Sequence, residues 1–333
     1  MLSLCVITKN EAHCIATMLE SARPIADEII VVDTGSTDGT QSIAQQHGAI
    51  VVDHPWCDDF SEARNASLAR ATQPWILVLD ADEELAVVSQ PELRGLLSAE
   101  PQAFSVRRLH FCSELQARVM FPLDINHPAR NRGAVAFFST TDYRLFPNDP
   151  KIRFRGVVHE SIEDAAAQSS LSRTATSIQV NHYGHLLSAD KKKAKAASYL
   201  FLARKNTEQF PEDWRTWYYL GAEYQAQGCF IEARGAFQHA LSMIDTYSPL
   251  WRELGITLHI CGEKDEALKA LRRALSINPG CILSWNALGL ILEHYGHYSE
   301  AQECFETVLK LDPGNALATE NLALIKKRGH GRK

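Results

Sequence analysis

The last third of the chain carries a repeat of 34 residues, and this repeat restricts the possible folds more than any other feature. Trp217, Trp251 and Trp285 follow one another at this spacing. The same spacing recurs downstream of each tryptophan, in Leu220-Gly221, Leu254-Gly255 and Leu288-Gly289, in Ala233, Ala267 and Ala301, and in Phe237, Leu271 and Phe305. A period of this length is typical of a helical pair that must stack on its neighbours to bury its apolar face.

The repeat resembles the tetratricopeptide repeat. Small residues such as Gly221 and Ala233 let the two helices of a unit approach closely. We predict an all-α tetratricopeptide solenoid of three repeats and a capping helix at 214–327, with a linker helix at 191–213 and a basic tail at 328–333. Such an array either holds a peptide or protein in its groove, or only packs against another domain or a second copy. The sequence does not identify the groove-facing residues.

The first part of the chain alternates short apolar runs with segments of helical periodicity. The predicted strands are 2–7, 28–32, 49–52 and 75–79, and the predicted helices are 11–22, 36–47 and 61–71. This alternation predicts an α/β fold with a mostly parallel sheet and helices on both faces. Ligands of such sheets bind at the carboxyl ends of the strands. We assign this domain to residues 1–190.

Polar residues follow three of the predicted strands. They are Thr8, Asn10 and Glu11 after the first strand, Asp33 after the second, and Asp80 and Asp82 after the fourth. Each group alone has a local explanation, such as a helix cap or a turn. Together they bring hydroxyl groups and carboxylates to one edge of the predicted sheet.

Four segments resemble the signature of family 2 glycosyltransferases, which have the GT-A fold. They are 7–11, 27–40, 60–65 and 75–83. The combination with tetratricopeptide repeats resembles a bacterial subgroup that includes peptide S-glycosyltransferases and lipopolysaccharide-core glycosyltransferases. The QxxRW motif of the processive members does not occur in the chain, which predicts transfer of a single sugar.

The resemblance implies a nucleotide-sugar donor. Its nucleotide would lie near Arg64 and Asp80, and near the residues that follow the first two strands, which are Thr8, Asn10, Glu11 and Asp33. We expect uridine diphosphate from its frequency in the family, although guanosine diphosphate or an ADP-linked heptose would leave the same sequence pattern.

The resemblance also implies a divalent cation on the donor. The departing diphosphate carries negative charge, which a cation stabilises as a Lewis acid, and carboxylate oxygens suit Mn²⁺ or Mg²⁺. Asp82 is the expected ligand, while Asp80 would bind the ribose or the metal. A histidine within 181–185 is either a third ligand or a structural histidine.

A later segment resembles the acceptor side of the same subgroup. Residues 157–158 form the predicted end of an apolar strand that carries His159 and Glu160 into the site. An inverting transfer needs a base for the acceptor's proton. Because Asp80 and Asp82 serve the donor, we expect Glu160 to be this base, with His159 as the alternative. A structural ion pair of Glu160 is the remaining explanation.

Composition narrows the class of protein further. The net charge of −6 argues against general nucleic-acid binding. No apolar run approaches the roughly 20 residues of a membrane span, and the first apolar run is too short for a signal peptide. The eight cysteines form no CxxC pair, so we expect buried thiols in a reducing cytoplasm.

The sequence therefore predicts an inverting, metal-dependent glycosyltransferase that adds one sugar to a peptide or protein. The alternatives are a lipopolysaccharide-core or other glycolipid acceptor, and an inactive scaffold in which only the repeats function. The intact carboxylates at the strand ends argue against the scaffold.

Overall fold

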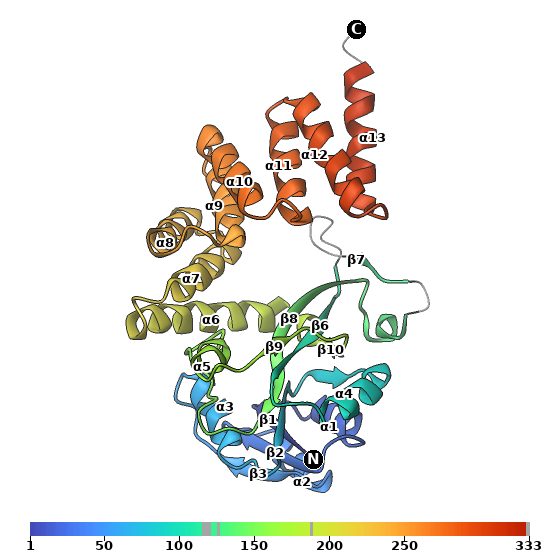
Figure 1. Cartoon of the computed structure of the whole chain (residues 1–333), viewed down its shortest axis with the longest axis vertical. Helices are drawn as coiled ribbons and strands as arrows, with labels where there is room; N and C mark the ends of the chain where they lie inside the picture. Colours follow the sequence, from blue (N-terminus) through green and yellow to red (C-terminus); the bar gives the residue numbers. More distant parts are fainter. Residues whose placement is uncertain (115–120, 125–126, 187–188, 331–333) are drawn as a thin grey trace. The chain divides into compact units, whose positions relative to one another are not determined.

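The computed structural model describes residues 1–114, 121–124, 127–186 and 189–330. Among them the chain forms two compact units, the first ending at Lys193 and the second beginning at Ala194. Figure 1 labels most of the helices and strands of both units.

The first unit is built on one sheet. Its parallel half has the order β3 (Ile50–Asp53), β2 (Glu28–Asp33), β1 (Leu2–Thr8) and β4 (Trp75–Asp80). The helices of this half are α1 (Ile15–Ala22), α2 (Thr40–Gln46) and α3 (Phe60–Leu68). The α/β fold predicted for this part is confirmed.

The second half of the sheet is mixed. It continues from β4 through β8 (Ala136–Pro147), β6 (Ala103–Cys112), β10 (Gln179–His182) and β5 (Glu83–Leu85). The short strands β7 (Phe121–Pro122) and β9 (Arg173–Thr174) pair with β8 and β6. The remaining segments are η1 (Val87–Ser89), α4 (Gln90–Leu96), η2 (Pro128–Arg132), α5 (Glu163–Gln168) and η3 (Gly184–Leu186). Strand β8 runs antiparallel to both β4 and β6, and this long-range pairing has no short sequence signature.

Hydrophobic cores cover both faces of the parallel half. Alternate residues of one strand belong to different clusters, since Leu4 and Val6 pack with helix α1 while Cys5 packs with Leu68 of α3. A sheet that is buried on both faces needs apolar side chains in both directions. This explains why its strands are nearly continuous hydrophobic runs.

Two predicted helices begin later than expected. The predicted helix 11–22 begins at Ile15, and the predicted helix 36–47 begins at Thr40. The residues before each helix form turns that bond to each other, because Asn10 accepts from the Thr37 amide and Ser36 Oγ accepts from the Asn10 amide, both at 2.8 Å. These polar contacts between separate loops compete with the first helical turns.

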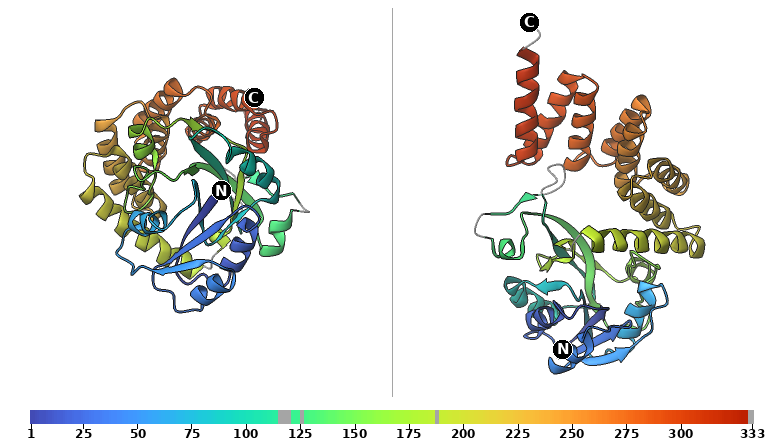
Figure 2. Two further views of the ribbon diagram at one scale, coloured as in Figure 1. Left: turned by 60° about the horizontal axis from the view of Figure 1, so that its bottom comes forward. Right: turned by 180° about the vertical axis from the view of Figure 1, so that it is seen from behind.

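The second unit consists of antiparallel helix pairs. After α6 (Ala189–Gln209) come the pairs α7 (Trp214–Ala226) and α8 (Phe230–Met243), α9 (Ser248–Ile260) and α10 (Lys264–Ile277), and α11 (Ile282–His294) and α12 (Tyr298–Leu311), then α13 (Ala316–His330). Figure 2 shows the pairs following one another within this unit. The predicted helical solenoid is confirmed.

The repeated glycines are required by packing. A Cβ atom at Gly221 would lie 2.5 Å from the Phe237 ring, and one at Gly289 would lie 2.9 Å from the Phe305 ring. The tryptophans also repeat one contact, since Trp251 Nε1 donates to the Asp245 carbonyl and Trp285 Nε1 to the Pro279 carbonyl, both at 2.8 Å. The sequence period is therefore a period of contacts.

Within the described residues, no helix has the length and apolar character needed to cross a membrane.

Candidate active site

The carboxyl ends of β1 and β2 carry a pair of buried polar atoms. Thr8 pairs with Asp33 in the parallel register. Asp33 Oδ2 accepts from the amides of Gly35 and Ser36 at 3.1 and 2.8 Å. Burial opposes the charged form, but hydrogen bonds from Ser36 and Gln41 outweigh it and lower the pKa of Asp33. Within the described chain, Asp33 Oδ1 and Thr8 Oγ1 are buried without a hydrogen-bond partner, as expected of atoms that await a ligand.

Asn10 and Glu11 connect the two loops at this edge. Besides the contacts of Asn10 already described, the Glu11 amide donates to Thr40 Oγ1 at 2.9 Å. Asn10 has a backbone φ of 57°, which is uncommon outside glycine. The structure therefore brings both residues to the predicted edge, where their described contacts hold the loop that carries Asp33.

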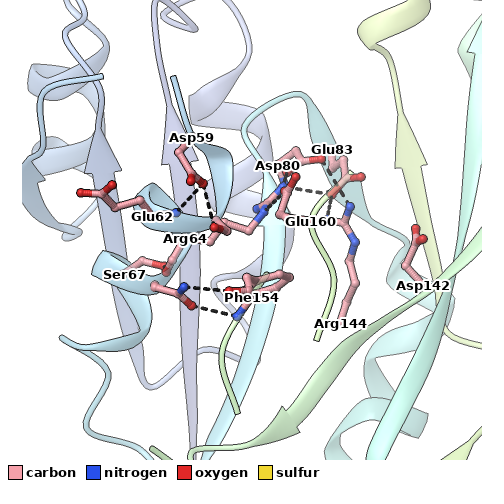
Figure 3. Close-up of polar contacts among 12 residues, drawn as sticks. Asp59, Glu62, Arg64, Ser67, Asp80, Glu83, Asp142, Arg144, Phe154 and Glu160 are labelled. Carbon is pink, nitrogen blue, oxygen red and sulfur yellow. Dashed lines mark hydrogen bonds and ion pairs between the residues drawn. The ribbon is translucent and has the colours of Figure 1, made fainter. Parts of the chain in front are cut away.

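Arg64 lies at the centre of a buried ion network. It occupies helix α3, whose N-cap Asp59 accepts from the Glu62 amide at 3.1 Å. Arg64 Nη2 bonds to Asp80 Oδ1 at 2.6 Å, and Arg64 Nε bonds to Glu160 Oε1. Figure 3 shows the Arg64 side chain pointing toward these two carboxylates. Its third nitrogen, Nη1, is buried with no hydrogen-bond partner among the described residues.

Two more arginines complete the network around Asp80. Arg144 Nη2 and Arg108 Nη1 lie 3.4 and 3.6 Å from Asp80 Oδ2. Burial opposes ionisation of Asp80, but Arg64, Arg144 and Arg108 outweigh it and hold its pKa well below the usual range. Arg144 also bonds to the fully buried Glu83 at 3.0 Å, while burial raises the pKa of that carboxyl. The oxygens of Asp80 therefore face guanidinium groups, which compete with a metal ion for them.

Asp82 lies in a different setting, beside His182. Asp82 Oδ2 is 3.4 Å from His182 Nε2. The Tyr183 amide donates to the Asp82 carbonyl at 3.1 Å, which holds the loop after β10 against Asp82. A Cβ at Gly184 would lie 2.3 Å from Asp82 Oδ2 and 2.8 Å from His182 Nε2. Any side chain at this position would therefore occupy the space next to both atoms.

The Asp82–His182 pair fits a divalent cation. Ligand atoms at about 2.1 Å from one ion are separated by about 3.0–3.4 Å in octahedral or tetrahedral geometry. The observed 3.4 Å is within this range. A nitrogen ligand suits Mn²⁺ better than Mg²⁺, which prefers oxygen.

His182 continues into a group of three histidines, His110, His182 and His185, whose ring nitrogens lie within 4.8 Å of one another. Burial and the neighbouring His182 lower the pKa of His110 to about 2, so this ring is neutral. The two buried rings of the group face each other, with Nδ1 of His110 and Nδ1 of His182 separated by 2.9 Å.

The predicted strand before His159 and Glu160 is wrong. Residues 157–159 form bends, and the Phe60 amide donates to the Val157 carbonyl at 2.9 Å. Asn65 clamps the same segment through two 2.9 Å bonds to the Phe154 backbone. Tertiary contacts with α3 therefore position Glu160 beside Arg64. The preceding residue, His159, has a left-handed backbone φ of 55°.

Sequence reasoning missed several members of the site. Arg108 lies in strand β6 and Glu83 directly follows Asp82, but neither was singled out. A charged pair, Arg107-Arg108, inside an otherwise apolar run was the available signal. The expectation that every cysteine is buried is also wrong, because Cys57 is exposed.

Comparison with known proteins identifies the family. Residues 3–143 match glycosyl transferase family 2, and residues 249–281 and 282–315 each match a tetratricopeptide repeat. An uncharacterized glycosyltransferase of Rickettsia conorii is 30% identical over 55% of this chain and 68% of its own length. The chain belongs to glycosyl transferase family 2.

Other relatives align with parts of this chain. A TPR repeat-containing protein of Synechococcus elongatus is 42% identical over 49% of the chain and 36% of its own length. The SPbeta prophage-derived glycosyltransferase SunS of Bacillus subtilis is 29% identical over 66% of the chain and 48% of its own length. The chain thus spans about a third to a half of these two relatives. Among solved structures, MamA aligns with 44% of the chain at 23% identity and a TM-score of 0.39.

Proposed function

We propose that this glycosyltransferase moves one sugar from a nucleotide-sugar donor, preferably a uridine diphosphate sugar with Mn²⁺, to a peptide or protein acceptor with inversion. The observation that carries the proposal is the Asp82–His182 pair beside Gly184. Asp82 follows β4, which pairs with β1 as does the strand that ends in Asp33. A bound Mn²⁺ would supply Lewis-acid stabilisation of the departing diphosphate. Asp82 and His182 would hold it.

The nucleotide has its own partners in this proposal. Asp33 Oδ1 accepts from a ribose hydroxyl or the base, and Thr8 Oγ1 lies beside it, since both atoms are buried without partners among the described residues. Asn10 and Glu11 support this loop. Arg64 Nη1 offers a buried cationic donor that a diphosphate oxygen would satisfy.

Asp80 orients Arg64 in this proposal and does not bind the metal. Its two oxygens already face three guanidinium groups. The sequence predicted Asp80 and Asp82 as metal ligands. In this proposal the ligands are Asp82 and His182.

The acceptor's proton goes to Glu160, with His159 as the alternative base. The bond from Arg64 fixes the position of Glu160 Oε1. A thiol acceptor is already partly ionised near neutral pH and demands less of a base than a hydroxyl does. A cysteine-containing peptide is therefore the acceptor that would depend least on this base.

Three tetratricopeptide units in the same chain support a peptide or protein acceptor over a glycolipid. None of the eight cysteines, all within the described residues, forms a disulfide with another, which supports a reducing compartment such as the cytoplasm.

A thermal-shift screen of nucleotide sugars with and without Mn²⁺ tests the donor site. We expect one nucleotide sugar to stabilise the protein only with Mn²⁺, and the Asp82→Asn variant to lose this stabilisation. Stabilisation that is equal in the variant would refute the metal site. Transfer to a glycolipid but not to cysteine or serine peptides, followed by mass spectrometry, would refute the acceptor.

A further inference from the structure

A chain of polar contacts runs from the sheet to Asp82 through two buried histidines. His110 and His182 lie opposite each other on the paired strands β6 and β10 and are 5% and 7% exposed. The Thr140 hydroxyl lies 2.8 Å from His110 Nε2. The Nδ1 atoms of the two rings are 2.9 Å apart, and His182 Nε2 is 3.4 Å from Asp82 Oδ2.

This geometry allows only two proton arrangements when both rings are neutral. In the first, His110 Nδ1–H donates to His182 Nδ1, and His182 Nε2–H therefore points at Asp82. In the second, His182 Nδ1–H donates to His110 Nδ1, His110 Nε2–H donates to Thr140 Oγ1, and the lone pair of His182 Nε2 faces Asp82. A neutral imidazole carries one proton, so the bond at one nitrogen fixes the state of the other.

Only the second arrangement lets His182 bind a cation. A metal ligand needs an unprotonated nitrogen, whereas the first arrangement places a proton where the ion would lie. Without a cation the second arrangement sets a lone pair against a carboxylate, so the first is favoured. Binding of a cation therefore requires a partner that accepts a hydrogen bond from His182 Nδ1–H.

We propose that His110 is a positioning residue whose Nδ1 accepts a hydrogen bond from His182 Nδ1–H and so holds the His182 Nε2 lone pair toward a cation on Asp82. This inference rests on the proposed function, because it assumes that Asp82 and His182 bind Mn²⁺. Thr140 completes the relay by accepting from His110 Nε2. Phe138 stacks on the His110 ring, with a centroid separation of 4.5 Å and an interplanar angle of 6°, and keeps Nδ1 aimed at His182.

The matched variants are His110→Asn and His110→Leu. Asparagine and leucine have nearly the same shape, but only asparagine carries an oxygen near the position of Nδ1 that accepts a hydrogen bond. The leucine variant lets His182 return to the tautomer that donates to Asp82, so its metal-free fold should be retained. Circular dichroism and the melting temperature check this for both variants.

The measurement is Mn²⁺ affinity of the full chain in the presence of uridine diphosphate, by electron paramagnetic resonance of free Mn²⁺. We expect His110→Leu to bind about 10- to 100-fold more weakly than the unsubstituted chain, the usual effect of removing a residue that orients a metal ligand. His110→Asn should restore most of this loss, and Thr140→Val should give a smaller loss.

The proposal would be overturned if His110→Leu bound Mn²⁺ as tightly as the unsubstituted chain. It would also be overturned if His110→Asn and His110→Leu bound Mn²⁺ equally weakly. Binding that survives Asp82→Asn but disappears in His185→Gln would show that the three histidines themselves take the ion, which also overturns it. If the unsubstituted chain binds no Mn²⁺, the metal of the proposed function fails, and this inference fails with it.

Discussion

Replacing Arg64 by methionine tests whether the buried network around Asp80 stabilises the first unit. The substitution removes a guanidinium group from between Asp80 and Glu160 and leaves a side chain of similar length beside the Phe154 ring, which lies 5.5 Å from the guanidinium carbon. Two carboxylates then lose their closest cation.

The expected cost follows from burial. Exposed ion pairs contribute only about 0–1 kcal/mol. The side chains of Arg64, Glu160 and Asp80 are 8%, 10% and 25% exposed, and breaking a buried pair costs about 3–5 kcal/mol. Because Asp80 keeps Arg144 and Arg108 nearby, we expect the lower end, about 3 kcal/mol. For a unit of this size, that lowers the melting temperature by about 6–12 °C.

Differential scanning calorimetry of the full chain measures this shift, and hydrogen exchange of the α3 and β4 peptides assigns the transition to the first unit. The control is Arg272→Met, which breaks a 2.8 Å pair with Glu300 whose side chains are 55% and 48% exposed. We expect the control to change the stability by less than about 1 kcal/mol. Equal effects of the two substitutions would refute the argument from burial.

The same variant has a predicted pH dependence. The pKa of Asp80 is lowered in the folded protein, so its contribution to stability is present above the unfolded pKa and is lost as the pH falls through the folded value. The stability difference between the unsubstituted and Arg64→Met proteins should therefore shrink as the pH falls below about 4. A difference that stays constant between pH 7 and pH 3 would contradict the assigned cause.

Three further predictions address the base, the nucleotide and the repeats. Glu160→Gln should leave donor affinity unchanged and lower the transfer rate by about 10²–10⁴; loss of donor binding in calorimetry, with the rate kept, would end its assignment as base. Asp33→Asn should weaken uridine diphosphate binding by about 10- to 100-fold, the worth of a charge-assisted hydrogen bond, without lowering the rate at saturating donor. Gly289→Ala should destabilise the repeat unit by about 1–3 kcal/mol, because its Cβ would lie 2.9 Å from Phe305, whereas Gly235→Ala, with open space around it, should stabilise it by up to about 1 kcal/mol. Thermal unfolding of both glycine variants checks the last pair, and equal shifts would show that the contact with Phe305 carries no strain.

Local and periodic features were determined by the sequence alone. The 34-residue period specifies the helix pairs because each conserved offset is a packing contact within or between units, as Gly221 against Phe237 shows. The alternation of the first 85 residues specifies the parallel strands, since both faces of those strands must be apolar. The polar residues after β1, β2 and β4 meet at one edge because parallel strands in register end together, with Thr8 opposite Asp33 and Ile7 opposite Asp80.

Only the tertiary structure decided which charges meet. Arg64 and Glu160 are separated by 96 residues, and Asp82 and His182 by a hundred, so no local pattern relates them. The segment that carries Glu160 has apolar residues typical of a strand, yet its backbone bonds to α3, because contacts with Phe60 and Asn65 satisfy its polar groups there. The surroundings of Asp80 and Asp82 differ for the same reason: strands β6 and β8 bring arginines to the first, and strand β10 brings a histidine to the second.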